Sequence, residues 1–255
     1  MKSDGSEPAA PRDIPRAQDE LFGQSGGAIG KYRRLVVGRA GLAALIKYEA
    51  VVLLSQAVPG ALGLALRKWC YRWLLGRCGR NVVFGQNVVL RHPHKISIGD
   101  DVVVDDNCLL DAKGADNDGI TIGSGVFIGR NTILSCKNGA MTIGDRANIG
   151  FNCEILSASQ VVVGPGTLIA AYVYLAGGDH EVVDRGLPVA AQARRSAGIR
   201  VGEGCWIGAG AIVLDGVDIG DRAIVGASAV VRASVPAGTT AVGVPARLVG
   251  SPVPP

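Results

Sequence analysis

A six-residue period of aliphatic side chains governs the chain from Ile98 onward. An Ile, Leu or Val opens each unit and is often followed by Gly, and a small residue often stands four places later. The period lapses at residues 113–118 and 181–198, and it keeps strict steps of six from Val201 to Val231. A repeat of this regularity predicts a solenoid in which each unit forms one short strand and one corner.

The repeat also predicts how the solenoid is packed. Three units would close a triangular coil of about 18 residues, and successive coils would stack as a parallel β-helix. The opening aliphatic side chains would fill the narrow interior, where only a small residue fits at the fifth place. Cys108, Cys153 and Cys205 occupy that fifth place, so we interpret these thiols as packing residues rather than nucleophiles.

Residues 28–80 carry a different pattern, with apolar side chains at roughly helical spacing. The pattern breaks at Pro59-Gly60, and a second helical segment is predicted over residues 61–75. Charged residues interrupt every long apolar run, so a simple transmembrane span is not expected. Basic apolar helices with Trp69 and Trp73 near their end are typical of the membrane interface. A helical cap packed on the β domain is the alternative interpretation.

The net charge of +4 is concentrated in the same part of the chain. Between residues 28 and 95, twelve Lys and Arg accompany one acid, Glu49, whereas residues 1–27 and 96–255 carry net charges of −2 and −5. Each basic residue near an anionic cytosolic leaflet contributes on the order of 1 kcal/mol to attachment. Peripheral attachment at the inner face of a membrane and a solvated cap are therefore equally favoured. No nucleic-acid partner is expected, because the interleaved phosphate and base contacts of such proteins are missing.

Composition limits the class and the compartment. The chain is 48% hydrophobic, 19% charged and rich in Gly, with 37 glycines, which excludes a disordered chain, a coiled coil and collagen. Six scattered cysteines without C-x-x-C spacing, and no apolar signal segment near the N-terminus, predict reduced thiols in the cytoplasm. The expected plan is a disordered tail at residues 1–27 and a helical segment at residues 28–80. A β-helix domain follows at residues 81–250, with a loop excursion at residues 181–198, and a second tail occupies residues 251–255.

The closing repeats, residues 201–211, 215–221, 225–231 and 242–247, carry a resemblance to a known family. They resemble the hexapeptide-repeat acyltransferases, which fold as left-handed β-helices. Within that family the chain is most similar to the sugar O-acetyltransferases for maltose, galactosides and capsule. The resemblance covers roughly residues 81–250. It implies an all-β, left-handed parallel β-helix, acetyl-CoA as donor, and a homotrimer with active sites between subunits.

The resemblance further implies a catalytic His where a coil ends before an extended loop. A coil ends at Asp179-His180 and the period then lapses, so His180 occupies the position of the family's base. A neutral imidazole with a pKa of about 6.5 can remove a hydroxyl proton during acyl transfer. Backbone N–H groups of Gly-rich corners can bind the oxyanion. Without the resemblance, a polar corner residue is a comparable interpretation of His180.

Other site residues are implied by the resemblance alone. Asn152 matches a stretch that can face the acceptor across the trimer interface, and a simple corner Asn is nearly as well favoured. The residues expected to bind acetyl-CoA are Ala209, Ala227, Arg232, Arg247 and Trp206. Of these, Arg232 departs from the family's usual Thr-Lys, and Trp206 has packing between coils as its alternative. The acids that could orient the imidazole are Asp179, Glu181 and Glu154, and none is preferred, since adjacent side chains in an extended chain point apart.

No metal site is expected, because His92-Pro93-His94 supplies two ligands at i and i+2 without a third nearby. The predicted reaction is O-acetyl transfer to a hydroxyl of a sugar, glycan or lipid-linked glycan precursor, as in polysaccharide biosynthesis. Cations of the loop at Arg185, Arg194 and Arg195 would suit an anionic sugar. N-acyl transfer to an amino-sugar nucleotide or amino acid, and a non-catalytic β-helical scaffold, remain as alternatives.

Overall fold

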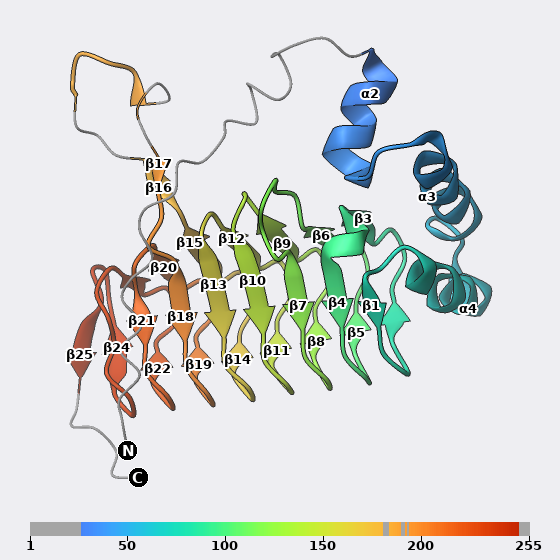
Figure 1. Ribbon diagram of the computed structural model, residues 1–255. Helices are drawn as coiled ribbons and strands as arrows, with labels where there is room; N and C mark the ends of the chain where they lie inside the picture. Colours follow the sequence, from blue (N-terminus) through green and yellow to red (C-terminus); the bar gives the residue numbers. More distant parts are fainter. Residues whose placement is uncertain (1–26, 181–183, 190–191, 193, 250–255) are drawn as a thin grey trace, which may run out of the picture.

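A computed structural model describes residues 27–180, 184–189, 192 and 194–249. Short strands stack as a triangular parallel β-helix, with helices at its N-terminal end (Figure 1). Nearly all of the two tails expected at residues 1–27 and 251–255 lies outside the described residues. The stack of about seven turns confirms the predicted all-β class, a parallel β-helix of hexapeptide repeats with an N-terminal helical segment.

Three parallel sheets form the sides of the triangle, and we number them by the order in which the chain enters them. Sheet 1 comprises β1 (Arg77–Cys78), β4 (Ile96–Ile98), β7 (Ile120–Ile122), β10 (Ala140–Ile143), β13 (Gln160–Val163), β18 (Ile199–Val201) and β21 (Asp218–Ile219). Sheet 2 comprises β2 (Val83–Phe84), β5 (Val103–Val104), β8 (Phe127–Ile128), β11 (Asn148–Ile149), β14 (Leu168–Ile169), β19 (Trp206–Ile207), β22 (Ile224–Val225), β24 (Thr240–Val242) and β25 (Arg247–Val249). Sheet 3 comprises β3 (Val89–Arg91), β6 (Leu109–Asp111), β9 (Ile133–Cys136), β12 (Glu154–Ser157), β15 (Tyr174–Gly177), β20 (Ile212–Leu214) and β23 (Val230–Val231). Only β25 runs antiparallel to its neighbour within these sheets.

The coils are longer in the N-terminal half than the strict repeat predicts. Arg200 pairs with Asp218, eighteen positions further on, as expected. Arg77, however, pairs with Ser97, twenty positions further on. The additional residues lie in strands of up to four residues and in the corners that lead from sheet 3 to sheet 1. That corner also accommodates the two interruptions of the period, because it is where the chain can leave the stack without breaking a sheet.

The interior of the triangle is the hydrophobic core. Aliphatic residues that open the repeats are buried along its whole length. Cys108, Cys153 and Cys205 are also buried, and each Sγ approaches a backbone carbonyl on the next coil at 3.2, 3.0 and 3.1 Å. Burial raises the pKa of each thiol, that of Cys108 to about 11. These are the properties of packing residues and not of nucleophiles.

The outward faces of the three sheets differ in polarity. In sheet 1 the outward column is mostly polar: Arg77, Ser97, Thr121, Thr142, Val162, Arg200 and Asp218. In sheet 2 it is mostly apolar: Val83, Val103, Phe127, Asn148, Leu168, Trp206 and Ile224. In sheet 3 it is again mostly apolar: Val89, Leu109, Ile133, Glu154, Tyr174, Ile212 and Val230. Apolar faces of this extent mark surfaces that contact other molecules.

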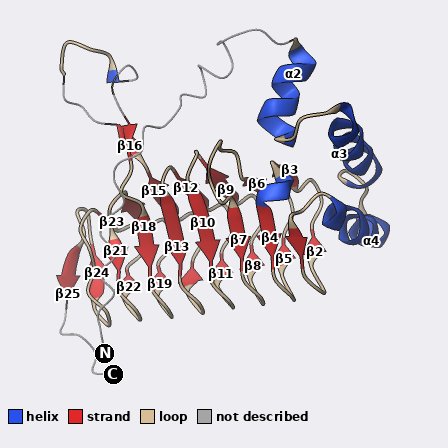
Figure 2. Cartoon of the chain, in the orientation of Figure 1, coloured by secondary structure: helices blue, strands red, loops and turns tan. Residues whose placement is uncertain are grey.

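The named helices of the described residues gather at the N-terminal end of the stack (Figure 2). They are α2 (Ala28–Tyr32), the π-helical turn η1 (Arg33–Val37), α3 (Leu42–Ser55), α4 (Gly60–Cys70) and the 3₁₀ turns η2 (Tyr71–Trp73) and η3 (Pro93–Lys95). Because β1 begins at Arg77, the last four residues of the segment predicted to be helical belong to the first coil. None of the described helices has the length and apolar character needed to cross a bilayer.

Buried polar side chains attach the helices to the first coil. The guanidinium of Arg67, which is 1% exposed, donates hydrogen bonds to the carbonyl oxygens of Ser55 (3.0 Å), Val58 (2.7 Å) and Phe84 (3.0 Å). The hydroxyls of Tyr48 and Tyr71 donate to carbonyl oxygens of β3 and the turn before it, at 2.9 and 2.8 Å. The helical segment therefore does cap the β-helix, as one of the two interpretations of the sequence predicts.

Candidate active site

The long excursion leaves the stack directly after β15. The chain turns at Gly178 and forms β16 (Asp179–His180), which pairs antiparallel with β17 (Arg194–Arg195), so that His180 lies opposite Arg194. Figure 1 shows this two-stranded stem rising from the corner between sheets 3 and 1. The backbone of His180 thus lies at the base of the excursion. Its side chain, together with residues 181–183, 190–191 and 193, lies outside what the structure describes.

Close packing explains why two glycines precede this stem. A Cβ at Gly177 would lie 2.4 Å from the carbonyl oxygen of Leu156, and one at Gly178 would lie 2.7 Å from the Cβ of Ala158. Gly178 also has a φ of +133°, which side chains disfavour. The Gly-Gly pair therefore lets the chain leave the coil immediately before His180.

A carboxylate on the next coil holds the returning strand of the stem. Asp215 accepts hydrogen bonds from the Ser196 hydroxyl (2.8 Å) and from the N–H groups of Ala197 (2.6 Å) and Gly198 (3.0 Å). The hydroxyls of Ser159 and Ser196 are 2.9 Å apart. Sequence analysis assigned no role to Asp215. Asp215 is the third residue of the hexad that Val213 opens, and nothing in the period marks it.

Among the described residues of the outer excursion, the side-chain amide of Gln192 bridges the two sides. Gln192 donates to the carbonyl oxygen of Asp184 (2.8 Å) and accepts from the Asp184 N–H (2.9 Å). The Asp184 carboxylate caps the following turn through the N–H of Gly186 at 2.7 Å. Arg185 is exposed beside this turn. The described part of the excursion is therefore hydrogen-bonded at its stem and between residues 184 and 192.

Asn152 lies in a different corner, between sheets 2 and 3. Its φ is +55°, and its side-chain oxygen accepts a hydrogen bond from the Asn131 amide at 3.0 Å. Asn87 and Asn107 make the same contact on earlier coils, at 3.2 Å. The geometry is that of a ladder of corner asparagines on successive coils. Next to it lies an exposed cluster in which the Phe151 ring contacts Arg130 and Tyr172.

Two of the residues expected to bind acetyl-CoA share that corner. Ala209 and Ala227 are exposed on consecutive coils, and the Ala209 carbonyl accepts from the N–H of Ser228 at 2.8 Å. Within the described part of the chain, neither alanine N–H donates a hydrogen bond. Trp206, 51% exposed, lies three residues before Ala209 on the outward face of sheet 2. These three residues therefore border one surface with free backbone donors.

The two arginines lie near the C-terminal end of the stack. Arg232 follows β23, at the opposite end of the sheet 3 strand from Ala227. Arg247 opens β25 beside Val242 of β24. Both are exposed, and the segment that leads to Arg247 contacts the corner of Ala227, where the Ala246 N–H donates to the carbonyl oxygen of Val230 at 2.8 Å.

The His-Pro-His motif belongs to the helical cap. A ring nitrogen of His92 lies 2.8 Å from the carbonyl oxygen of Arg34, and the His92 and His94 rings stack with centroids 6.0 Å apart. Burial, reinforced by nearby cations, lowers the pKa of His94 to about 4. Among the described residues, no group of three or more His, Cys, Asp or Glu is arranged to hold a metal ion. The motif therefore serves to dock η1 on the first coil.

Comparison with known proteins places these features in a family context. The pattern for the bacterial transferase hexapeptide (six repeats) matches residues 198–233, and that for the hexapeptide repeat of succinyl-transferase matches residues 77–112 and 141–176. A probable acetyltransferase of Mycobacterium tuberculosis is 32% identical over 130 residues, which are 51% of this chain and 43% of that protein. Nodulation protein L of Rhizobium meliloti is 42% identical over 74 residues, 29% of this chain and 39% of that protein. The matches thus span less than half the length of these relatives.

A solved structure shows the same fold. It is a mutant of AntD, an N-acyltransferase from Bacillus cereus, in complex with dTDP and coenzyme A, at 18% identity and a TM-score of 0.52, covering 79% of this chain and 92% of that one. Fold and repeats together define a hexapeptide-repeat β-helix protein. The resemblance of the chain to the hexapeptide-repeat acyltransferases, indicated by its closing repeats, is confirmed.

Proposed function

We propose that the protein is an acetyl-CoA-dependent O-acetyltransferase, acting in the cytoplasm on a hydroxyl of a sugar, glycan or lipid-linked glycan precursor. The observation that carries the proposal is the excursion whose stem contains His180 on a hexapeptide-repeat β-helix. Asp215 fixes that stem from the next coil. Acyl transfer requires a base that is held beside the acceptor hydroxyl.

In the proposed reaction His180 acts as the general base. The acceptor oxygen attacks the thioester carbonyl carbon while the imidazole takes the hydroxyl proton. The C–S bond then breaks, and the proton passes to the departing CoA thiolate. The free N–H groups of Ala209 and Ala227 are the proposed contacts to the pantetheine arm, with Trp206 as a wall. No thiol of the core is needed as a nucleophile, in keeping with their burial.

A homotrimer would complete the site. The outward columns of sheets 2 and 3 are mostly apolar, whereas that of sheet 1 is mostly polar. Two apolar faces that meet at one corner suit a cyclic assembly, in which one face of each subunit packs against the other face of the next. The corner with Ala209 would then lie in a groove between subunits. Asn152, on the same corner, would face the acceptor there.

The test is release of CoA thiol from acetyl-CoA with a panel of acceptors. His180→Gln is expected to lower turnover at least about 100-fold without loss of folding. The matched control, His94→Gln, makes the same change outside the excursion and is expected to retain turnover. Full activity of folded His180→Gln protein would refute the proposed base.

The same panel separates the alternatives. N-acyl transfer predicts thiol release with amino sugars or amino acids and none with hydroxyl acceptors, and AntD is an N-acyltransferase of this fold. A non-catalytic scaffold predicts no CoA binding and no effect of His180→Gln. We further propose that residues 28–80 hold the enzyme at the inner face of an anionic membrane, next to a lipid-linked acceptor.

A further inference from the structure

The outer surface of the helical cap is apolar. Along α3 the exposed side chains include Leu42, Ile46 and Leu53, the last 79% exposed. Along α4 and η2 they include Leu62, Trp69 and Trp73, and the two indole rings lie 5.8 Å apart in an edge-to-face contact. Spacings of four and seven residues place each set on one side of its helix. We call these six side chains the apolar surface of the cap.

The apolar surface is not used for docking on the β-helix. Docking uses the opposite side of each helix, where Tyr48, Arg67 and Tyr71 are buried against the first coil. A helix that covers a soluble protein normally presents polar residues outward. Helices α3 and α4 instead present large apolar side chains outward. The outer side of α3 and α4 is therefore suited to contact with an apolar environment other than the β-helix.

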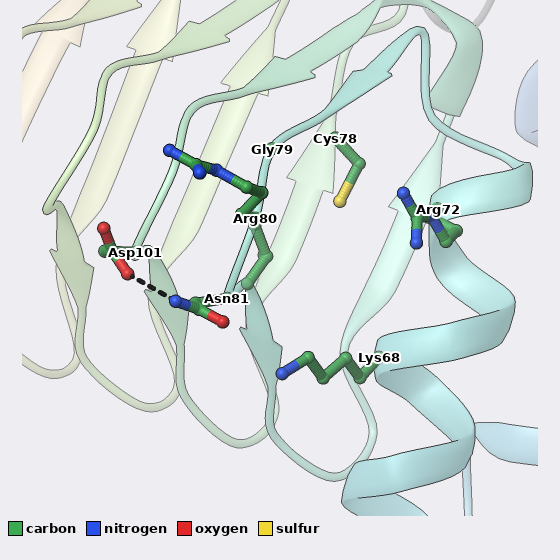
Figure 3. Close-up of a pocket in the computed structure, with 8 residues that line it drawn as sticks. Lys68, Arg72, Cys78, Gly79, Arg80, Asn81 and Asp101 are labelled. Atoms are coloured by element: carbon green, nitrogen blue, oxygen red, sulfur yellow. Dashed lines mark hydrogen bonds between the residues drawn. The ribbon is translucent and has the colours of Figure 1, made fainter.

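A cationic pocket lies beside this surface, between α4 and the first coil. Its volume is about 430 Å³, and its lining includes Lys68, Arg72 and Arg80. Figure 3 shows the Lys68 and Arg72 side chains extending from the helix toward the coil. Neither forms an ion pair within the described part of the chain, whereas Arg80 pairs with Asp100 at 3.0 Å. The one lining carboxylate, Asp101, accepts a hydrogen bond from Asn81 at 3.0 Å.

Two cations of the pocket are sequence neighbours of the two indoles of the apolar surface. Lys68 immediately precedes Trp69, and Arg72 immediately precedes Trp73. Successive helical residues are about 100° apart, so the two cations form a stripe next to the two indoles. Residues 28–80 contain ten Lys and Arg but a single acid, Glu49. A ligand that contacts both the two cations and the two indoles must carry an anionic group next to an apolar part.

We propose that the pocket binds the phosphate of an anionic phospholipid while the apolar surface lies in the membrane interface. Trp side chains favour that interface, and Lys and Arg bind phosphate through charge-assisted hydrogen bonds. The inference rests on the proposed membrane attachment of residues 28–80 and is independent of acyl transfer. A free phosphate would occupy the cations alone and leave the neighbouring indoles in water.

The experiment is sedimentation of the full chain with phosphatidylcholine vesicles that contain or lack phosphatidylglycerol. Replacing both pocket cations, Lys68→Ala with Arg72→Ala, should lower partitioning onto the anionic vesicles about 30-fold, at roughly tenfold per 1.4 kcal/mol. Replacing both indoles, Trp69→Ser with Trp73→Ser, should lower it at least about tenfold. The matched control, Arg200→Ala with Arg222→Ala, removes the same charge from exposed positions on the β-helix and should change partitioning less than about threefold.

Each remaining outcome counts against the proposal. Retained partitioning of the Lys68 and Arg72 variant, or an equal loss in the matched control, would overturn the pocket. Saturable binding of glycerol phosphate in calorimetry, with unchanged partitioning of the indole variant, would assign the pocket to a soluble phosphate. A change in oligomeric state of the indole variant without loss of partitioning would assign the apolar surface to a second copy. Thiol release measured in parallel keeps failure here distinct from failure of the enzymatic proposal.

Discussion

Replacing Arg67 by Met is expected to detach the helical cap from the β-helix. Three short hydrogen bonds end on the guanidinium, and their acceptors are carbonyl oxygens at the end of α3, in the turn before α4, and in β2. One side chain thus joins both long helices to the first coil. Met has similar length and packs well, so the variant removes the charge and its donors while leaving no large cavity.

The size of the effect follows from burial. Hydrogen bonds from a charged donor contribute about 1.5–3 kcal/mol each, and a buried carbonyl left without a partner costs a comparable amount. The variant also removes the cost of desolvating a guanidinium that is 1% exposed. This gain offsets several kcal/mol of the lost hydrogen-bond energy. We expect a net loss of about 3–5 kcal/mol from the docking of the cap. With an m value near 1 kcal/mol/M, its urea midpoint would fall by about 3 M or more.

The three tryptophans allow the cap and the β-helix to be monitored separately. A Trp206→Phe background leaves Trp69 and Trp73 as fluorescent reporters of the cap, and the converse background leaves Trp206 as a reporter of the stack. In urea titrations, Arg67→Met should lower the midpoint of the cap and leave that of the stack nearly unchanged. The matched control is Arg72→Met, because the Arg72 side chain is exposed in η2. This variant should change the free energy of unfolding of the cap by less than about 0.5 kcal/mol. An unchanged cap midpoint in Arg67→Met would refute the reasoning.

Three further predictions follow from the site and the core. Burial lowers the pKa of His94 to about 4, from an ordinary value of 6.5. The unfolded chain therefore takes up the proton first, and stability should fall as the pH drops from 6.5 toward 4; a flat melting temperature across this range would contradict the prediction. Asp215→Ala should loosen the returning strand of the excursion and lower kcat at least about tenfold with intact circular dichroism, whereas Asp218→Ala, exposed on sheet 1, should not. Burial raises the pKa values of Cys108 and Cys136 to about 11 and 12, so a disulfide reagent should modify neither in the folded protein at pH 7, and mass spectrometry of labelled peptides would detect a failure.

The repeat made the fold predictable because each hexad encodes its own strand and corner. The buried columns of aliphatic residues and the three core thiols follow from local spacing alone. Coil length did not follow, since the pairing of Arg77 with Ser97 depends on residues added in corners that the hexads do not define. The repeat fixes which side chains point inward, and corners between sheets 3 and 1 are free to vary.

The candidate site was predictable only where it interrupts the repeat. His180 could be located because the period ends there, and the structure gives the backbone reason in the packing of Gly177 and Gly178. Asp215 could not be assigned, because its hydrogen bonds reach Ser196 and the residues after it across two coils. The corner shared by Ala209 and Ala227 likewise depends on stacking of successive coils.

The helical cap shows why composition alone could not choose between a membrane surface and a packed cap. Ten cations in one segment look alike in sequence, yet Arg67 is buried and bonded to carbonyl oxygens, whereas its neighbour Lys68 lines an open pocket. A step of one residue turns a helical side chain by about 100°, which separates the docking side of α4 from its outer side. The two interpretations therefore apply to different sides of the same helix. Packing explains Arg67, and the exposed Trp69 beside Lys68 is left for the membrane surface that we propose.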